Sequence, residues 1–262
     1  MRKNQKKLVK ILSNYYEKDD ELMIFDIGAR DGEESIFFSK IFPNSTVYSF
    51  ECNPDIISKC EHNIKGFDNI NLIKKAVSNS DDPINFYPID CEKSQTKHRD
   101  GNPGASSIFK INDYSKREKY IQKEIKVQSI TLKSFMTQKN IKKINILWMD
   151  TQGAELLILE GLEEKINDID IIHTEVEFIQ MYKNQPLFND IKSFLNKNNF
   201  LLIKFTSFSK FFGDAVFINK NILEDECTEI RDKYLYTYYK YIGIYVNYLE
   251  YLLEMTKGII KK

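Results

Sequence analysis

Phe25-Asp-Ile-Gly-Ala-Arg-Asp-Gly32 is the stretch of the chain that decides the fold. It completes an apolar run over residues 22–27, as expected for a strand buried on both faces of a parallel sheet, and leads into an expected helix over residues 33–42. A glycine directly after a strand lets the backbone approach a ligand closely, and a helix N-terminus offers free N–H groups to an anion. The spacing differs from the dinucleotide fingerprint Gly-x-Gly-x-x-Gly. The stretch therefore indicates a nucleotide-type site, with a plain tight turn as the alternative.

The same alternation of apolar runs and amphipathic segments continues along the chain. Further strands are expected at residues 46–51, 70–77, 124–129, 144–150, 170–178, 200–205 and 214–219. Further helices are expected at residues 3–18, 54–65, 131–139, 154–166 and 187–198. This order predicts an α/β fold with a doubly wound sheet, whose last two strands are adjacent enough to pair antiparallel. Between residues 83 and 107 the pattern is irregular, with a candidate extra strand over 83–90 and a long polar loop over 93–107.

Three segments are expected along the chain: a leading helix over residues 1–20, a main domain over 21–222 and a helical tail over 223–262. The tail holds eight of the 15 tyrosines, and several of them recur at three- and four-residue steps. This stripe is expected to pack back on the domain, to form a subunit interface of a homo-oligomer, or to contact a membrane surface.

Composition excludes several classes of protein. The 262 residues carry 38 Lys and Arg against 38 Asp and Glu, whereas a dedicated nucleic-acid binder normally has a basic excess. The longest apolar runs are far shorter than the roughly 20 residues of a membrane span, and no secretory signal pattern follows the basic N-terminus. The four cysteines have no metal-binding or disulfide spacing. A cytoplasmic protein with free thiols is expected.

Glu51 closes the second expected strand, where a carboxylate can accept hydrogen bonds from the two hydroxyls of a ribose. This position favours an adenosine-bearing ligand over the alternative of a solvated charge.

Five short motifs together point to a known family. They are Asp26-Ile-Gly-Ala with Gly32, Phe50-Glu-Cys-Asn-Pro54, Lys75-Ala-Val-Ser78, Asp150-Thr-Gln-Gly-Ala-Glu155 and Glu175-Val-Glu177. Over roughly residues 20–205 the chain resembles the S-adenosylmethionine-dependent methyltransferases of the FkbM family, most specifically in the Asp-x-Gln-Gly-Ala-Glu segment. The resemblance implies a Rossmann-like class I methyltransferase fold, with a seven-stranded, mostly parallel sheet, an antiparallel end strand and helices on both faces. It also implies methyl transfer, usually to oxygen.

The resemblance further implies which residues hold S-adenosyl-L-methionine and its product S-adenosyl-L-homocysteine. Asp26 would lie near the methionine amino group and Glu51 on the ribose, with Ala76 beside the adenine. The backbone around the methionine moiety would come from Gly28, Ala29, Arg30 and Gly32. Arg30 stands where the general class often has a middle glycine, so the local shape of the loop is left open.

Transfer of a methyl group to an alcohol requires alignment of the reacting atoms and removal of the hydroxyl proton. Asp150 follows a core strand at the sheet edge where ligands bind, while His173 and Glu175 share one face of the next strand. These three residues are the candidate catalytic groups. His173 is the best placed as a base near neutral pH, with a half-buried structural histidine as the alternative. Asp150 and Glu175 are also candidate ligands for Mg²⁺, although two carboxylates do not define a metal site.

The expected function is O-methylation of a hydroxyl on a sugar or nucleotide-linked sugar in surface polysaccharide biosynthesis. Arg99 in the polar loop is a candidate for binding the phosphate of such an acceptor. Two alternatives remain open: methylation of a natural-product hydroxyl, and a non-catalytic nucleotide-binding subunit of an assembly.

Overall fold

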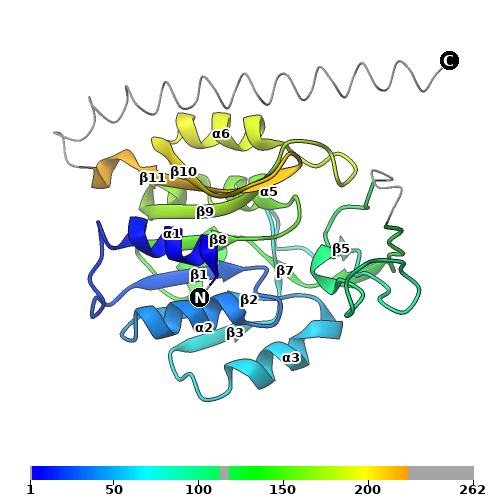
Figure 1. Ribbon diagram of the computed structural model, residues 1–262. Helices are drawn as coiled ribbons and strands as arrows, with labels where there is room; N and C mark the ends of the chain where they lie inside the picture. The colour runs from blue at the N-terminus through cyan, green and yellow to red at the C-terminus, as the bar shows by residue number, and fades with distance from the viewer. Residues whose placement is uncertain (1, 113–117, 224–262) are drawn as a thin grey trace.

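A seven-stranded sheet forms the centre of the computed structural model, which describes residues 2–112 and 118–223 (Figure 1). The strands of this sheet are β1 (Met23–Ile27), β2 (Thr46–Phe50), β3 (Ile70–Ile73), β8 (Ile144–Met149), β9 (Ile169–Glu177), β10 (Phe200–Phe208) and β11 (Phe212–Asn219). Two small two-stranded sheets pair β4 (Ala76–Val77) with β7 (Ser129–Ile130) and β5 (Ile84–Phe86) with β6 (Ile125–Val127). The α-helices are α1 (Lys3–Leu12), α2 (Glu33–Ile41), α3 (Pro54–Ile64), α4 (Leu132–Gln138), α5 (Glu155–Glu160) and α6 (Phe188–Lys197).

The strand order is β10-β11-β9-β8-β1-β2-β3. Strands β3, β2, β1, β8 and β9 run parallel in the order 3-2-1-4-5 of doubly wound folds, and β11 runs antiparallel to both β9 and β10. The α/β fold class implied by the resemblance, that of a class I methyltransferase with an antiparallel end to its sheet, is confirmed. The chain reverses its direction of progress at β1 and β8, so the crevice at this switch point is where a ligand is expected.

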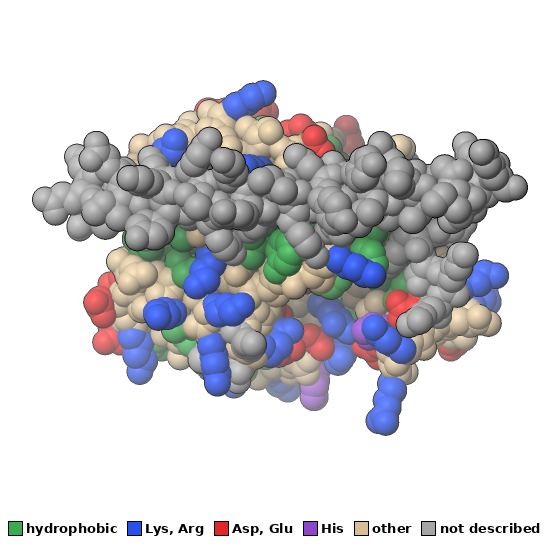
Figure 2. Space-filling view, turned by 45° about the horizontal axis from the view of Figure 1, so that its top comes forward, with side chains coloured by type: hydrophobic (Ala, Val, Ile, Leu, Met, Phe, Trp, Pro, Cys, Tyr) green, Lys and Arg blue, Asp and Glu red, His purple; other side chains and the backbone are tan. Residues whose placement is uncertain are grey.

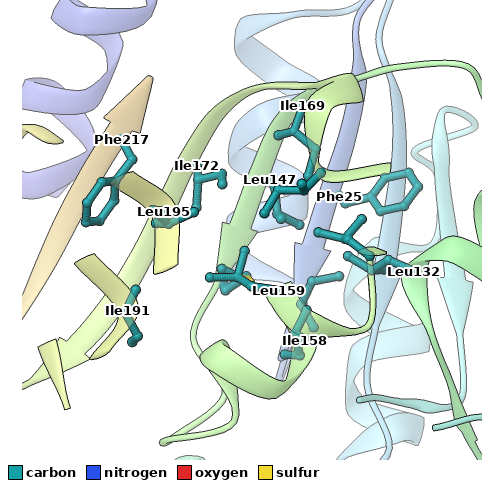
Figure 3. Packing of buried hydrophobic residues seen from close by; sticks show 14 of the residues in the cluster. Phe25, Leu132, Leu147, Ile158, Leu159, Ile169, Ile172, Ile191, Leu195 and Phe217 are labelled. Atoms are coloured by element: carbon teal, nitrogen blue, oxygen red, sulfur yellow. The ribbon is translucent and has the colours of Figure 1, made fainter. Parts of the chain in front are cut away.

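Alternating side chains of the parallel strands supply two hydrophobic cores, one on each face of the sheet. Phe25 and Leu147 point to the face that α4, α5 and α6 cover, as Figure 3 shows for the cluster around Leu132, Ile158 and Leu195. Their neighbours point to the opposite face, which α1 and α2 cover: these are Ile24, Ile146 and Ile171. Burial on both faces explains why the strands are nearly continuous apolar runs.

Several element boundaries differ from the sequence expectation. The strand expected at 124–129 is divided between β6 and β7, which belong to the two small sheets. The leading helix ends at Leu12 rather than near residue 18. The apolar run 70–77 is two strands, since β4 leaves the main sheet and pairs with β7. The helix expected at 154–166 covers only Glu155–Glu160, and a 3₁₀ helix (Glu163–Asp168) follows. Between them lies Gly161, where an added Cβ would come within 2.5 Å of the Ser78 carbonyl oxygen.

The expected tail, residues 223–262, lies outside the described residues except for the buried Leu223. The leading helix is described, and its Leu8 and Leu12 are fully buried in the core that α2 also covers. Within residues 2–112 and 118–223, no helix is both long and apolar enough to cross a membrane. On the face of the molecule that Figure 2 shows, the Lys and Arg side chains of the described residues are spread among acidic and apolar ones.

Candidate functional site

A cavity of about 850 Å³ opens at the carboxyl ends of β1, β2, β8 and β9, the edge of the sheet that contains the switch point. Its volume lies in the range of sites for small molecules and cofactors. Its described lining includes residues from the β1 turn, from the end of β2, from the turn after β8 and from the loop 93–107.

Two glycines shape the turn after β1. Gly28 has a φ of +81°, and a Cβ there would lie 2.1 Å from the carbonyl oxygen of Asp150. Gly32 has a φ of +82° at the start of α2, where a Cβ would lie 2.6 Å from Ile64 Cγ2. The N–H groups of Gly28 and Ala29 both donate to the carbonyl of Phe50. The turn is therefore fixed between β2 and β8, and neither glycine has room for a side chain.

Arg30 joins this turn to the polar loop. It adopts a left-handed backbone with a φ of 50°, which explains why glycine is common at this position in the general class. Its N–H donates to Glu51 Oε2 at 2.8 Å, and its guanidinium donates to Asp100 Oδ2 at 2.9 Å. The same guanidinium lies about 3.3 Å from where a Cβ of Gly104 would be. Arg30, which stands where glycine is common, therefore contacts the loop 93–107 through its side chain.

Glu51 lines the cavity but is only 9% exposed. Its Oε1 accepts the N–H of Asn53 at 2.7 Å, and its Oε2 accepts the N–H of Arg30. Burial raises the pKa of the Glu51 carboxyl, and these two backbone donors oppose the rise. Each carboxyl oxygen is left with accepting capacity toward the cavity. Ala76 lines the same end of the cavity.

Asp26 lies beneath the turn rather than in the described lining of the cavity. Its side chain is 1% exposed and accepts a short hydrogen bond from Ser35 Oγ on α2. No described residue donates to its Oδ1. Burial raises the pKa of Asp26 to about 7, although the Ser35 hydroxyl opposes the rise.

Three carboxyl groups gather at the other end of the cavity: Asp150 directly after β8, Glu175 on β9 and Asp214 on β11. Glu175 and Asp214 face each other across the β9–β11 pair. Burial raises the pKa of Glu175 well above its usual range, and the neighbouring Asp150 adds to the rise. Desolvation by the surrounding protein also raises the pKa of Asp150, and a hydrogen bond from Gln152 opposes the rise. The Asp150 side chain itself is exposed to the cavity.

Glu155 closes the turn between β8 and α5. It is fully buried, and its carboxyl accepts the N–H groups of Thr151 at 2.8 Å and Gly153 at 3.0 Å. Burial raises the pKa of Glu155 to about 7, against the effect of these donors. Glu155, the last residue of the Asp-x-Gln-Gly-Ala-Glu segment, therefore stabilises the turn that follows Asp150, its first residue.

The structure does not bring His173 to the cavity. Its ring stacks on Trp148 with centroids 3.9 Å apart, and it is Trp148 that lines the cavity. His173 Nε2 lies 2.8 Å from Thr206 Oγ1, and the side chain is 1% exposed. Burial lowers the pKa of His173 to about 4. The expectation that His173 is the best-placed base does not fit this position. The alternation of side chains along a strand predicts which face of the sheet His173 is on, but not how deeply it is buried there.

Several lining residues were not expected from the sequence. Among them are Asp214 on β11 and also Trp148, Gln152, Met181, Tyr182 and Phe211. Gln152 stands inside the recognised motif, so its motif position was an available signal. Asp214 reaches the cavity only through the pairing of β11 with β9, and the others are apolar or aromatic residues, whose pattern does not distinguish a cavity wall from a core.

The loop 93–107 forms one wall of the cavity, as its length suggested. Its described lining residues include His98, Asn102 and Ser106 but not Arg99. In the parts of the chain that the structure describes, no group of three or more His, Cys, Asp and Glu side chains is arranged to hold a metal ion.

Comparison with known proteins identifies the family. A family model described as "Methyltransferase FkbM domain" matches residues 26–202. The chain is similar to the 2-O-methyltransferase NoeI of Sinorhizobium fredii, with 26% identity over 171 residues that cover 64% of this chain and 68% of that protein. It is also similar to Methyltransferase 1 of Beauveria bassiana, with 25% identity over 158 residues, or 57% and 62% of the two chains.

Among solved structures, TrmK of M. capricolum in complex with S-adenosyl-homocysteine aligns with a TM-score of 0.46 and 13% identity, over 94% of this chain and 87% of that chain.

We expect Gly28→Ala to lower the free energy of unfolding by about 3 kcal/mol or more, because it combines a left-handed backbone with a clash against the Asp150 carbonyl. Gly66→Ala is the matched control, since Gly66 also has a positive φ but nothing lies within 4 Å of its added Cβ. Its expected loss is about 1 kcal/mol. Urea unfolding of the two variants measures the difference, and equal losses would contradict the close approach at Gly28.

We expect His173 to make the fold acid-sensitive between about pH 6.5 and 4. Its folded pKa of about 4 lies below the ordinary value of 6.5, so the unfolded chain binds the extra proton in this window and stability falls as the pH falls. The loss approaches about 3 kcal/mol at pH 4. His173→Gln should remove this part of the pH dependence in urea unfolding, whereas the control His62→Gln, on the exposed side of α3, should keep it. Identical curves for wild type and His173→Gln would contradict the buried neutral histidine.

Proposed function

The chain belongs to the FkbM methyltransferase domain family, and from this premise we propose that it transfers the methyl group of S-adenosyl-L-methionine to a hydroxyl oxygen of a small-molecule acceptor. The observation that carries the proposal is the cavity at the switch point, which has Glu51 at one end and Asp150 at the other. The Gly28 turn lies between these two ends.

The residues of the cavity fit this cofactor. Glu51 offers carboxyl oxygens to the ribose hydroxyls, Ala76 lies where an adenine ring would stack, and the turn from Gly28 to Gly32 lies where the methionine moiety would reach. The absence of a Cβ at Gly28 is what such a close backbone approach requires. Once bound, S-adenosyl-L-methionine supplies an electrophilic methyl group on a sulfonium. Asp26, beneath the turn, supports α2 rather than the cofactor directly in this proposal.

The protein's contribution to the reaction is to bind, to orient and to accept a proton. Displacement at a methyl carbon needs the acceptor oxygen in line with the methyl group, so water must be excluded and the acceptor held in one orientation. Asp150 is open to the cavity and directly follows the strand beside the Gly28 turn, which makes it the group that accepts the hydroxyl proton. His173 has a structural role under Trp148.

The acceptor we propose is a sugar hydroxyl, in a free or nucleotide-linked sugar that is used for a surface polysaccharide. The carboxyl groups of Asp150, Glu175 and Asp214 are hydrogen-bond acceptors that a group rich in hydroxyls can satisfy. The relative from Sinorhizobium fredii, whose name specifies transfer to a 2-oxygen, supports an oxygen acceptor. In domain terms we propose that residues 21–222 form the catalytic unit, with the leading helix packed on it and the tail as a separate element.

We expect Glu51→Ala to weaken the binding of S-adenosyl-L-homocysteine by about 1–3 kcal/mol, the range for a lost hydrogen bond to a charged group. Isothermal titration calorimetry measures this change. Glu61→Ala is the matched control, because Glu61 lies on α3 outside the described lining and pairs with Lys74 at the surface. Unchanged affinity in a folded Glu51→Ala protein would reject the ribose assignment.

We expect a screen of free and nucleotide-linked sugars with S-adenosyl-L-methionine to identify a methylated acceptor, and Asp150→Asn to lower kcat on it by about 10²–10⁴. The physical reason is that the amide cannot accept the hydroxyl proton. Binding of S-adenosyl-L-homocysteine should persist in this variant, and the exposed Asp68→Asn serves as the control. Full turnover by Asp150→Asn would show that another group is the base.

A further inference from the structure

Gln152 spans two carboxyl groups at the acceptor end of the cavity. Its Nε2 lies 2.8 Å from Asp150 Oδ1 and 2.6 Å from Glu175 Oε2. A side-chain amide nitrogen carries two hydrogens, so it can donate one to each carboxyl group. Both hydrogens of the Gln152 amide are therefore donated to this pair of carboxyl groups.

The rest of Gln152 is also held. Its Oε1 lies 2.9 Å from the hydroxyl of Tyr182, which is also 2.9 Å from the Ala105 carbonyl oxygen and shares its one hydrogen between these two acceptors. This contact orients the amide so that the nitrogen faces the carboxyl groups. Its backbone carbonyl accepts from Ser107 Oγ at 2.8 Å, and its backbone has a φ of 57°. A non-glycine residue in this conformation costs about 1–3 kcal/mol and persists only when its surroundings fix it. The surroundings of Gln152 thus hold a strained backbone in place at the cavity wall, which indicates that the position of its side-chain amide matters.

The charge around the pair limits its ionisation. Other charged side chains act on the pair from the neighbouring elements: Arg30, Glu155, Glu177 and Asp214. Three of these four are acidic. A negative charge on one of these two carboxyl groups raises the pKa of the other, and the further acids behind them add to this effect, so the pair resists double ionisation. Glu175 is the more enclosed of the two at 8% exposure, whereas Asp150 is exposed to the cavity, so solvation favours the charge on Asp150.

We propose that Asp150 and Glu175 hold one proton between them at neutral pH, on Glu175, and that Gln152 is the positioning residue that keeps the ionised Asp150 aimed into the cavity. The amide donates to both members of the pair, and Tyr182 fixes the amide from the far side.

The consequence for the reaction rests on the proposed function. The acceptor O–H bond breaks and its proton passes to Asp150, while the electron pair of that oxygen forms the new bond to the methyl carbon. The electron pair of the broken carbon–sulfur bond stays with sulfur. Glu175 keeps its proton throughout, so the pair as a whole becomes neutral after one turnover and then releases one proton to water.

The test is a carboxyl titration that uses no acceptor. The full chain, labelled with ¹³C at the side-chain carboxyl carbons of Asp and Glu and bound to S-adenosyl-L-homocysteine, is followed by NMR from pH 4 to 9. Asp150→Asn and Glu175→Gln assign the two resonances. The expected result at pH 7 is an ionised Asp150 and a protonated Glu175. Two ionised groups, two protonated groups or the reverse assignment would overturn the proposal.

The role of Gln152 is tested by Gln152→Asn. Asparagine tolerates the left-handed backbone, but its amide is one carbon too short to span both carboxyl groups. The midpoint of the Asp150 titration should rise by about one pH unit, because its ionised form loses a hydrogen bond. Gln138→Asn, at the exposed C-terminal end of α4 and outside the described lining, is the control and should leave the midpoint unchanged.

Tyr182→Phe provides a second, independent variant, since it frees the amide while leaving Gln152 in place. It should move the Asp150 midpoint in the same direction. An Asp150 midpoint that neither variant moves would remove Gln152 from this role. A sugar screen without product would reject the proposed function and leave these titrations standing, so the two failures are distinguishable.

Discussion

The close approach of Gly28 to the carbonyl of Asp150 is the constraint on which the site depends. The first strand turns into α2 at this point, directly against the strand that carries Asp150, and a single added carbon would lie 2.1 Å from the Asp150 oxygen. Since no side chain separates the two backbones, the segment that fits a nucleotide and the segment that carries the carboxyl groups share one cavity. The parallel pairing of β1 with β8 brings the ends of both segments to the same edge of the sheet.

Buried acidic residues surround this contact, and they fall into two groups: some stabilise the backbone and others face the cavity. Asp26 and Glu155 are enclosed, each with a pKa of about 7, and their hydrogen bonds join α2 to β1 and α5 to the turn after β8. Asp150 and Glu175 face the cavity instead. The same residue type therefore supports the backbone in one place and lines the cavity in another, and the difference is set by depth in the sheet rather than by sequence spacing.

The sequence was sufficient for the sheet, because burial on both faces leaves continuous apolar runs between glycines and helices. Gly28, Gly32 and Glu51 were recognisable since each stands at a strand end where backbone shape or ligand chemistry restricts the residue type. The depth at which a side chain lies in the sheet could not be predicted from the sequence. His173 has the residue type of a base, yet Trp148 separates it from the cavity, and that stacking depends on the register of two neighbouring strands. Tyr182 reaches Gln152 from 30 residues away, a contact that only the folded chain specifies.

The two ends of the loop 93–107 are held by different kinds of contact. Near Ala105 the loop is fixed by the buried Tyr182 hydroxyl, which lies 2.9 Å from the Ala105 carbonyl oxygen and shares its hydrogen with Gln152 Oε1. Near Asp100 it is held by the pair with Arg30, whose side chains are 45% and 48% exposed, and such a surface pair contributes roughly 0–1 kcal/mol and weakens with salt. The Asp100 end is also held by a hydrogen bond from Asn102 Nδ2 to the Tyr120 hydroxyl at 2.8 Å and by backbone pairing of Gln95 with Lys119. A rise in ionic strength would therefore loosen the Arg30–Asp100 contact beside the cavity and leave the hydrogen bonds of the loop in place.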